Sequence, residues 1–211
     1  MEILVGNPPI LVNVFIPIGA KKIAVLLSGG SDSAILLYIL AKECKKYNIE
    51  CIPFTVPRAD GAMSYSPNIV MEINKLLNVD ISIPIVVGDP ENNHHSQQTR
   101  SGHREILKKF PDIDYVYYGS QSISSELENI PGVEYPWRPN RLFYQGKTVC
   151  PFYDLTKDHT IELYYELGVE DLLKYTHTCC VWDKGRCGKC YNCIERAWAF
   201  KKLSKIDPGH L

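Results

Sequence analysis

The residues best suited to chemistry form a hexapeptide of small, hydroxyl and acidic side chains, Ser28-Gly29-Gly30-Ser31-Asp32-Ser33. An apolar run precedes it and apolar residues at helical spacing follow it, so a strand, a tight loop and a helix are expected. Glycines let a backbone approach its ligand closely, and the first N–H groups of a helix attract anions. The segment from Leu27 to Ala34 therefore predicts a site for the phosphates of a nucleotide.

The side chains of this loop indicate how it would hold ATP. The hydroxyls of Ser28, Ser31 and Ser33 can donate to phosphate oxygens. Asp32 either caps the helix or binds the Mg²⁺ that accompanies ATP. The pattern differs from the Gly-x-x-x-x-Gly-Lys-Ser/Thr loop and from the dinucleotide Gly-x-Gly-x-x-Gly pattern. A turn that only caps a helix is the alternative, and the flanking strand and helix favour the nucleotide site.

A group of cysteines near the C-terminus forms a second candidate site. Cys187, Cys190 and Cys193 are each separated by two residues, and Cys179 or Cys180 can supply a fourth sulfur. Four thiolates around Zn²⁺ leave no position for water, so such a site is structural. Buried free thiols, a redox pair or an iron-sulfur cluster are competing interpretations. The charge of the thiolates would be offset by four nearby cations: Lys184, Arg186, Lys189 and Arg196.

Strand and helix patterns alternate along the chain, which favours a parallel sheet with helices on both faces. We expect one α/β domain over residues 1–211, with ligands beyond the carboxyl ends of the strands. Residues 122–148 lack periodicity and are expected to form a loop. The expected strands are 22–27, 50–56, 80–87 and 115–118, and the expected helices are 33–44, 69–77, 97–110, 160–174 and 194–203.

Composition narrows the class of protein. The chain has 211 residues, a formal net charge of -1 and 45% hydrophobic residues, as expected of a globular protein. Binding to duplex nucleic acid by charge alone is not expected, because it needs a basic face. No signal peptide or membrane span is expected, so we predict a cytoplasmic protein. Its 8 cysteines then point to thiolates and metal rather than disulfides.

Taken together, these motifs resemble the 7-cyano-7-deazaguanine synthases, or QueC proteins, of the PP-loop ATP pyrophosphatase superfamily. The similarity extends from about Lys22 to Phe200. It includes the hexapeptide, the stretch Pro-Phe-Tyr-Asp-Leu-Thr-Lys that ends at Lys157, and the cysteine region from Thr178 onward. The combination is much more specific than any one of its parts.

The resemblance implies a Rossmann-like fold of the adenine nucleotide alpha-hydrolase type. It also implies catalytic roles for Asp32 and Lys157 near the ATP phosphates, and the cofactors ATP, Mg²⁺ and Zn²⁺. In the implied reaction, ATP adenylylates the carboxylate of 7-carboxy-7-deazaguanine, ammonia displaces AMP to give the amide, and a second adenylylation leads to the nitrile. The implied Zn²⁺ ligands are Cys179, Cys187, Cys190 and Cys193.

The chain departs from the family pattern where the acceptor substrate is expected. The departures are Arg100-Ser101-Gly102-His103-Arg104, Gly119-Ser120-Gln121 and Tyr135-Pro136-Trp137-Arg138. A related enzyme that adenylylates a tRNA, DNA or protein-borne group is therefore one alternative, and a nucleotide-sensing module is another. The expected partners are a small deazaguanine carboxylate and ammonia, without nucleic acid or membrane, and a homodimer is an open alternative to a monomer.

Overall fold

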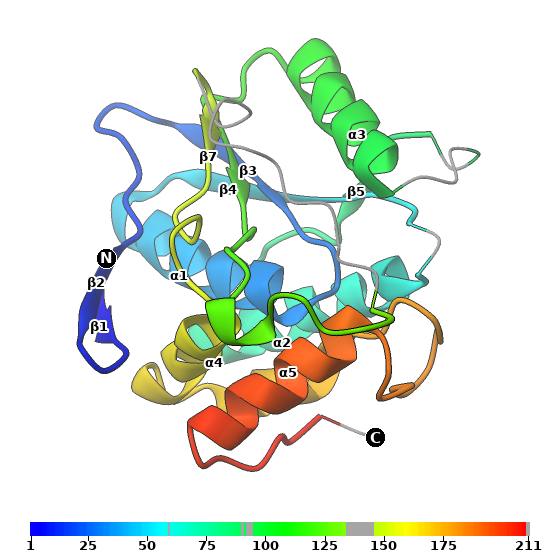
Figure 1. Cartoon of the computed structure of the whole chain (residues 1–211). Coiled ribbons are helices and arrows are strands. Elements are labelled where there is room, and N and C mark those ends of the chain that lie inside the picture. Colours follow the sequence, from blue (N-terminus) through cyan, green and yellow to red (C-terminus); the bar gives the residue numbers. More distant parts are fainter. Residues whose placement is uncertain (59, 90, 92–94, 134–145, 210–211) are drawn as a thin grey trace.

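The structure is a computed structural model of the chain and describes residues 1–58, 60–89, 91, 95–133 and 146–209 (Figure 1). Its centre is a parallel five-stranded sheet in the order β5-β4-β3-β6-β7. An antiparallel hairpin of β1 and β2 stands apart from this sheet. The strands are β1 (Glu2–Val5), β2 (Ile10–Asn13), β3 (Lys22–Leu26), β4 (Glu50–Thr55), β5 (Ile85–Val86), β6 (Tyr115–Tyr118) and β7 (Thr148–Val149).

Alternation along the central strand divides the core into two layers. In β3, Ile23 and Val25 belong to the larger core cluster, whereas Ala24 and Leu26 belong to the smaller one. Successive side chains of a strand point to opposite faces, so both faces of this strand are buried. Four consecutive buried apolar residues therefore mark the middle strand of the sheet.

Helices cover the two faces unequally (Figure 1). The helix α3 lies alone on one face, where its Ile106 packs into the smaller cluster. The opposite face is covered by α1 and α2, with α4 and α5 packed beyond α1. The helices are α1 (Ser31–Tyr47), α2 (Ser66–Leu77), α3 (His95–Lys109), α4 (Lys157–Glu166) and α5 (Tyr191–Lys202), with short 3-10 helices η1 (Ala62–Tyr65), η2 (Ser125–Leu127) and η4 (Glu170–Tyr175).

The predicted fold class is confirmed, while several element bounds differ. The expected strand 80–87 is reduced to β5, and the expected helix 160–174 becomes α4 followed by η4. Patterning did not reveal the β1–β2 hairpin, whose exposed Leu4 and Leu11 face each other across the strands. Nor did it reveal β7, because two residues are too few to show a period.

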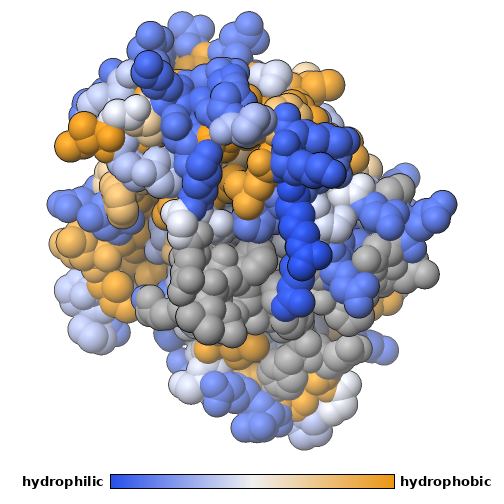
Figure 2. Space-filling view, turned by 90° about the horizontal axis from the view of Figure 1, so that it is seen from above, coloured by the Kyte–Doolittle hydropathy of each residue, from blue (hydrophilic) through white to orange (hydrophobic). Residues whose placement is uncertain are grey.

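The surface is mixed in character. Figure 2 shows polar and apolar side chains interspersed on the face seen from above. Among the described residues, no helix is both long and apolar enough to cross a bilayer.

Candidate functional site

The predicted phosphate loop lies between β3 and the N-terminus of α1, at the carboxyl end of the central strand. The chain continues from β3 to β4 and β5 on one side, whereas β6 and β7 pair on the other side. The loop therefore lies at the point where the strand order reverses. In open α/β sheets this is the usual place for a ligand.

Close contacts hold the loop in its shape. Gly29 has a φ of 87°, and a Cβ there would lie 1.9 Å from the carbonyl oxygen of Ala62. The backbone N–H of His177 donates to the carbonyl of Gly29 at 2.9 Å. Only glycine fits between these neighbours, because a side chain would collide with backbone atoms. Two distant segments, η1 and the stretch before the cysteines, thus fix one small loop.

The first turn of α1 leaves N–H groups available for an anion. The first helical hydrogen bond runs from the N–H of Ala34 to the carbonyl of Gly30. The N–H groups of Ser31, Asp32 and Ser33 come before it, so they have no acceptor within the helix. With the positive end of the helix dipole, they can hold phosphate oxygens.

The other residues of the predicted loop make contacts with the interior of the protein. Leu27 and Ala34 are fully buried, and the N–H of Leu27 donates to Phe54 in β4. The hydroxyl of Ser33 lies 3.1 Å from that of Ser28 and donates to the carbonyl of Gly30. These groups support the loop through contacts inside the protein.

Asp32 is a site residue and not a helix cap. The cap position is Gly30, without a side-chain hydrogen bond, and Asp32 lies in the first turn. Its carboxylate accepts from Lys157 Nζ at 2.5 Å and from the hydroxyl of Thr160 at 2.8 Å. Of the two predicted roles, the structure excludes capping, and the Mg²⁺ role stays a prediction.

The residue after β6 approaches the backbone of the first turn of α1 closely. A Cβ on Gly119 would lie 2.8 Å from backbone atoms of Asp32 and Ser33, so this position also requires glycine. Gln121, two residues further, is buried, and its side-chain oxygen lies 2.9 Å from the hydroxyl of Thr160. One of the three departures from the family pattern therefore lies beside Asp32.

The departure at residues 100–104 lies in α3. His103 is buried and its ring lies 3.1 Å from the hydroxyl of Thr148, away from the loop contacts described above. Burial, with nearby Arg104 second, lowers the pKa of His103, so the neutral ring is favoured. Residues 135–138 fall outside the described part of the chain.

Lys157 brings a buried positive charge to the loop. It begins α4, and its side chain is only 6% exposed. Besides Asp32, its ammonium lies 3.5 Å from the hydroxyl of Ser31 and 3.8 Å from a carboxylate oxygen of Glu195 in α5.

Tyr164 of α4 also contacts the first turn of α1. The hydroxyl of Tyr164 donates to the carbonyl of Ser31 at 2.5 Å. Burial, followed by the effect of Asp32, raises the pKa of Tyr164. Elements far apart in the sequence thus converge on the first turn of α1.

A cavity of about 710 Å³ opens beside the loop. It is bordered by residues after β4, by η1, by α3 and by the loop between Cys180 and Cys187, including Arg58, Tyr65, Gln98 and Lys184. The ring of Tyr65 stacks on His177, with ring centroids 4.7 Å apart. Among the described residues, the side-chain oxygen of Gln98 is buried and has no hydrogen-bond partner. This volume suits a small molecule.

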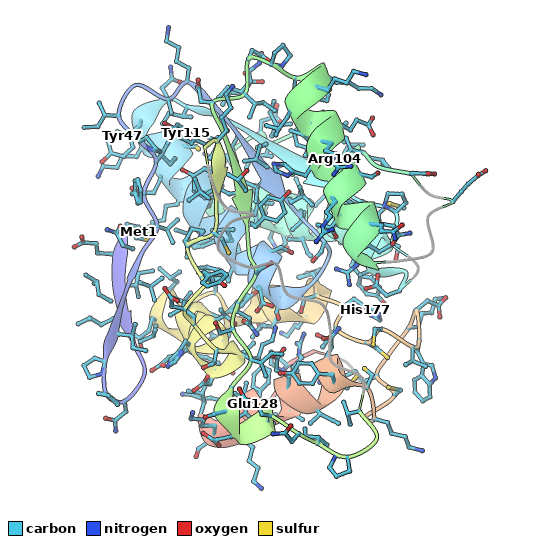
Figure 3. All side chains as sticks on the ribbon, turned by 45° about the horizontal axis from the view of Figure 1, so that its top comes forward. Met1, Tyr47, Arg104, Tyr115, Glu128 and His177 are labelled. Atoms are coloured by element: carbon cyan, nitrogen blue, oxygen red, sulfur yellow. The ribbon has the colours of Figure 1, made fainter. Side chains whose placement is uncertain are left out.

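The four predicted metal ligands are close together. The sulfurs of Cys179, Cys187, Cys190 and Cys193 all lie within 4.8 Å of one another. Figure 3 shows sulfur atoms gathered in the light-orange loop before α5, next to the labelled His177. Zn–S bonds of about 2.3 Å would need only small movements from this arrangement. The residues therefore form a metal site that fits a tetrahedral ion, and its identity as Zn²⁺ stays a prediction.

Backbone N–H groups point at these sulfurs. Those of Val181 and Trp182 donate to Cys179 at 3.4 and 3.2 Å, and that of Cys190 donates to Cys187 at 3.3 Å. Burial raises the pKa of Cys190, but hydrogen bonds from the backbone outweigh it, and the net effect lowers the pKa. Such donors favour thiolate over thiol, which is the form that binds metal.

Two of the four cations expected near the sulfurs have another partner. Arg196 is fully buried and donates to Asp207 at 2.7 and 2.9 Å and to the hydroxyl of Thr176 at 2.8 Å. Arg186 also forms an ion pair with Asp207. One carboxylate thus faces two guanidinium groups, so one positive charge is left over, and the expectation that these arginines offset thiolate charge stays a prediction. Their contacts hold that segment against the stretch before the cysteines.

Sequence reasoning did not identify three residues of the site. Thr160, Tyr164 and Glu195 contact Asp32, Ser31 and Lys157, respectively. Spacing held a partial signal, since Thr160 and Tyr164 lie three and seven residues after Lys157 and so share its helix face. Glu195 had no such signal, because its position depends on how α5 packs against α4.

Comparison with known proteins supports the same identification. Residues 138–204 match the family model described as queuosine biosynthesis protein QueC. The 7-cyano-7-deazaguanine synthase of Methanococcus maripaludis strain C7 is 27% identical, with 87% of this chain and 95% of that protein covered. The synthase of Rickettsia massiliae is 24% identical, with 89% and 97% covered. The resemblance predicted from the motifs is confirmed: the chain is similar to 7-cyano-7-deazaguanine synthases over most of its length, and to the QueC family model over residues 138–204.

Proposed function

We propose that this protein is an ATP-dependent ligase that converts 7-carboxy-7-deazaguanine and ammonia to 7-cyano-7-deazaguanine. The similarity to synthases of that name supports the product. The observation that carries the proposal is the pair of Lys157 and Asp32, 2.5 Å apart at the N-terminus of α1. A lysine, a carboxylate and helix N–H groups at one point suit the departure of pyrophosphate.

In the first step, a carboxylate oxygen of the substrate bonds to the α-phosphorus of ATP, and pyrophosphate leaves. Ammonia then attacks the acyl carbon, and AMP departs with that oxygen to give the amide. A second ATP adenylylates the amide oxygen, and loss of AMP and of both amide protons leaves the nitrile. The N–H groups of Ser31, Asp32 and Ser33 hold the outer phosphates, and the ammonium of Lys157 neutralises charge that grows on pyrophosphate. Mg²⁺ bound through Asp32 would supply further neutralisation.

The acceptor heterocycle is assigned to the cavity beside the loop. Arg58 and Lys184 complement a carboxylate, and the ring of Tyr65 suits a planar heterocycle. The side-chain oxygen of Gln98 can accept from a ring N–H. This placement supports a small acceptor, in keeping with the relatives.

The four sulfurs are assigned a structural Zn²⁺. Coordination by Cys179, Cys187, Cys190 and Cys193 fills all four positions, so the ion takes no part in the reaction. Its role is to fix the loop that starts α5.

Incubation with ATP, Mg²⁺, ammonium and 7-carboxy-7-deazaguanine tests the proposal, with amide, nitrile, AMP and pyrophosphate measured by mass spectrometry. We expect both products, and a loss of about a hundredfold or more in Lys157→Met. Lys174→Met is the matched control, because Lys174 is 47% exposed and pairs with the exposed carboxylate of Asp171. A wild-type protein that gives neither amide nor nitrile contradicts the proposed substrate.

A further inference from the structure

The proposed function leaves unexplained a buried carboxylate on α5. Glu195 is 2% exposed, and one of its oxygens accepts from the hydroxyl of Tyr191 at 3.1 Å. Its other oxygen lies 3.8 Å from Lys157 Nζ. A carboxylate rarely remains in such surroundings without a charged partner, because its desolvation is costly.

Lys157 therefore lies between two carboxylates from different helices. Asp32 in α1 is 2.5 Å from the ammonium, and Glu195 in α5 is 3.8 Å from it. Two negative charges surround one positive charge, so the pair with Asp32 can open without leaving Lys157 unpartnered. In the proposed reaction it must open, because both Asp32 and Lys157 then act on the phosphates and their metal.

We propose that Glu195 is a positioning residue that holds the ammonium of Lys157 at the phosphate site when Asp32 turns to Mg²⁺. This inference rests on the proposed function and adds a specific role to a residue outside both motifs. Tyr191 fixes the carboxylate through its hydroxyl, and the metal loop that precedes α5 fixes the helix. Glu195 is thus the one link, among the contacts described, that runs from α5 directly to Lys157.

A double-mutant cycle isolates this role. Glu195→Gln keeps the shape and removes the charge, so we expect kcat to fall about tenfold with the KM for the acceptor nearly unchanged. In the Lys157→Met background the same substitution should have no further effect, because the group it positions is gone. Glu195→Asp should recover part of the lost rate. Independent, multiplying effects in the two backgrounds would overturn the proposal.

Matched controls separate positioning from stability. Glu126 in η2 pairs at the surface with Lys202, which belongs to α5 as Glu195 does, at 3.1 Å. Glu126→Gln therefore removes a comparable but exposed carboxylate, and it should leave kcat unchanged. Melting temperatures of all variants show whether each folds. If Glu195→Gln lowers the melting temperature and leaves kcat per folded molecule unchanged, the carboxylate is structural only and the proposal fails.

A binding measurement keeps the inference independent of turnover. Calorimetric titration with Mg·ATP needs no acceptor. It is applied to the wild type, Glu195→Gln, Lys157→Met and the double variant. We expect Glu195→Gln to weaken the binding of Mg·ATP several-fold when Lys157 is present. In the Lys157→Met background the same substitution should leave this affinity unchanged. If this difference in Mg·ATP affinity is observed but no nitrile forms, the proposed acceptor is rejected and the role of Glu195 is upheld. Equal weakening in both backgrounds would reject the role of Glu195 whatever the acceptor is.

Discussion

The phosphate loop and the cysteine loop differ in what holds their backbone in place. The phosphate loop is fixed by the fold: a buried strand precedes it, and the backbone of Ala62 and of His177 contacts Gly29 directly. The cysteine loop has mostly exposed or half-buried residues between Cys180 and Cys190, and its four sulfurs converge on one point. The first loop is therefore held by contacts within the protein, whereas we expect a metal ion to complete the second.

Removal of metal should produce the largest effect, because only the cysteine loop depends on a ligand for its order. Treatment with a strong chelator, or Cys187→Ser, should unfold the C-terminal region and lower the melting temperature by tens of degrees. Calorimetry and metal analysis check this, with one equivalent of Zn²⁺ expected per chain. A chelated protein that melts at the same temperature would show that the sulfurs are ordinary core thiols.

Gly29→Ala should abolish nucleotide binding with a smaller effect on stability. The new methyl group would lie 1.9 Å from the carbonyl oxygen of Ala62, so the loop must shift away from the first turn of α1. Strain at this φ adds a cost of about 1 kcal/mol or more. Calorimetric titration with Mg·ATP measures the loss, and Gly146→Ala, at a positive φ with open space, is the matched control. Normal binding by Gly29→Ala would contradict a preformed loop.

Asp207→Asn should weaken the attachment of the C-terminal segment by about 3 kcal/mol, because Arg196 would lose a buried partner. Burial raises the pKa of Asp207, but Arg196 and Arg186 outweigh it, so the net effect lowers the pKa. A lowered pKa means that this stabilisation is present above the unfolded value of about 3.9 and is lost as pH falls through the folded value. Urea unfolding as a function of pH should show a shallower acid limb in the variant.

Gln98→Leu should have a smaller effect that is confined to the acceptor. Gln98 is one of the residues that line the cavity, so we expect the KM for the acceptor to rise about tenfold, with the KM for ATP unchanged. Steady-state kinetics with each substrate varied in turn decide this. A rise in the KM for ATP instead would assign the cavity to the nucleotide.

Cys180→Ser should have the smallest effect. Cys180 is exposed and lies outside the group of four sulfurs, although burial of its sulfur, followed by its contact with Cys190, raises the pKa of Cys180 to about 12. Stability should change by less than about 0.5 kcal/mol, and metal content should remain the same. Loss of metal from this variant would show that Cys180 replaces Cys179 as a ligand.

The sequence predicted best what depends on local pattern. The strand before Ser28 and the helix after it follow from apolar periodicity. The cysteine spacing singled out Cys187, Cys190 and Cys193, and the family resemblance added Cys179 as the fourth sulfur that the structure brings together with them. The partners of Lys157 did not follow, because Asp32, Thr160 and Glu195 meet only through packing of three helices. The partner of Arg196 did not follow for the same reason, since Asp207 reaches it from a segment without regular structure.

The hydrogen bond from His177 to Gly29 is a route by which binding at one site can change the affinity of the other site. His177 precedes Cys179 by two residues, so the same short stretch borders the nucleotide loop and the metal loop. If an ion in the second loop improves nucleotide affinity by some factor, linkage requires nucleotide to tighten retention of the ion by that factor. A cell short of metal would then lose the ion last from those molecules that are saturated with ATP.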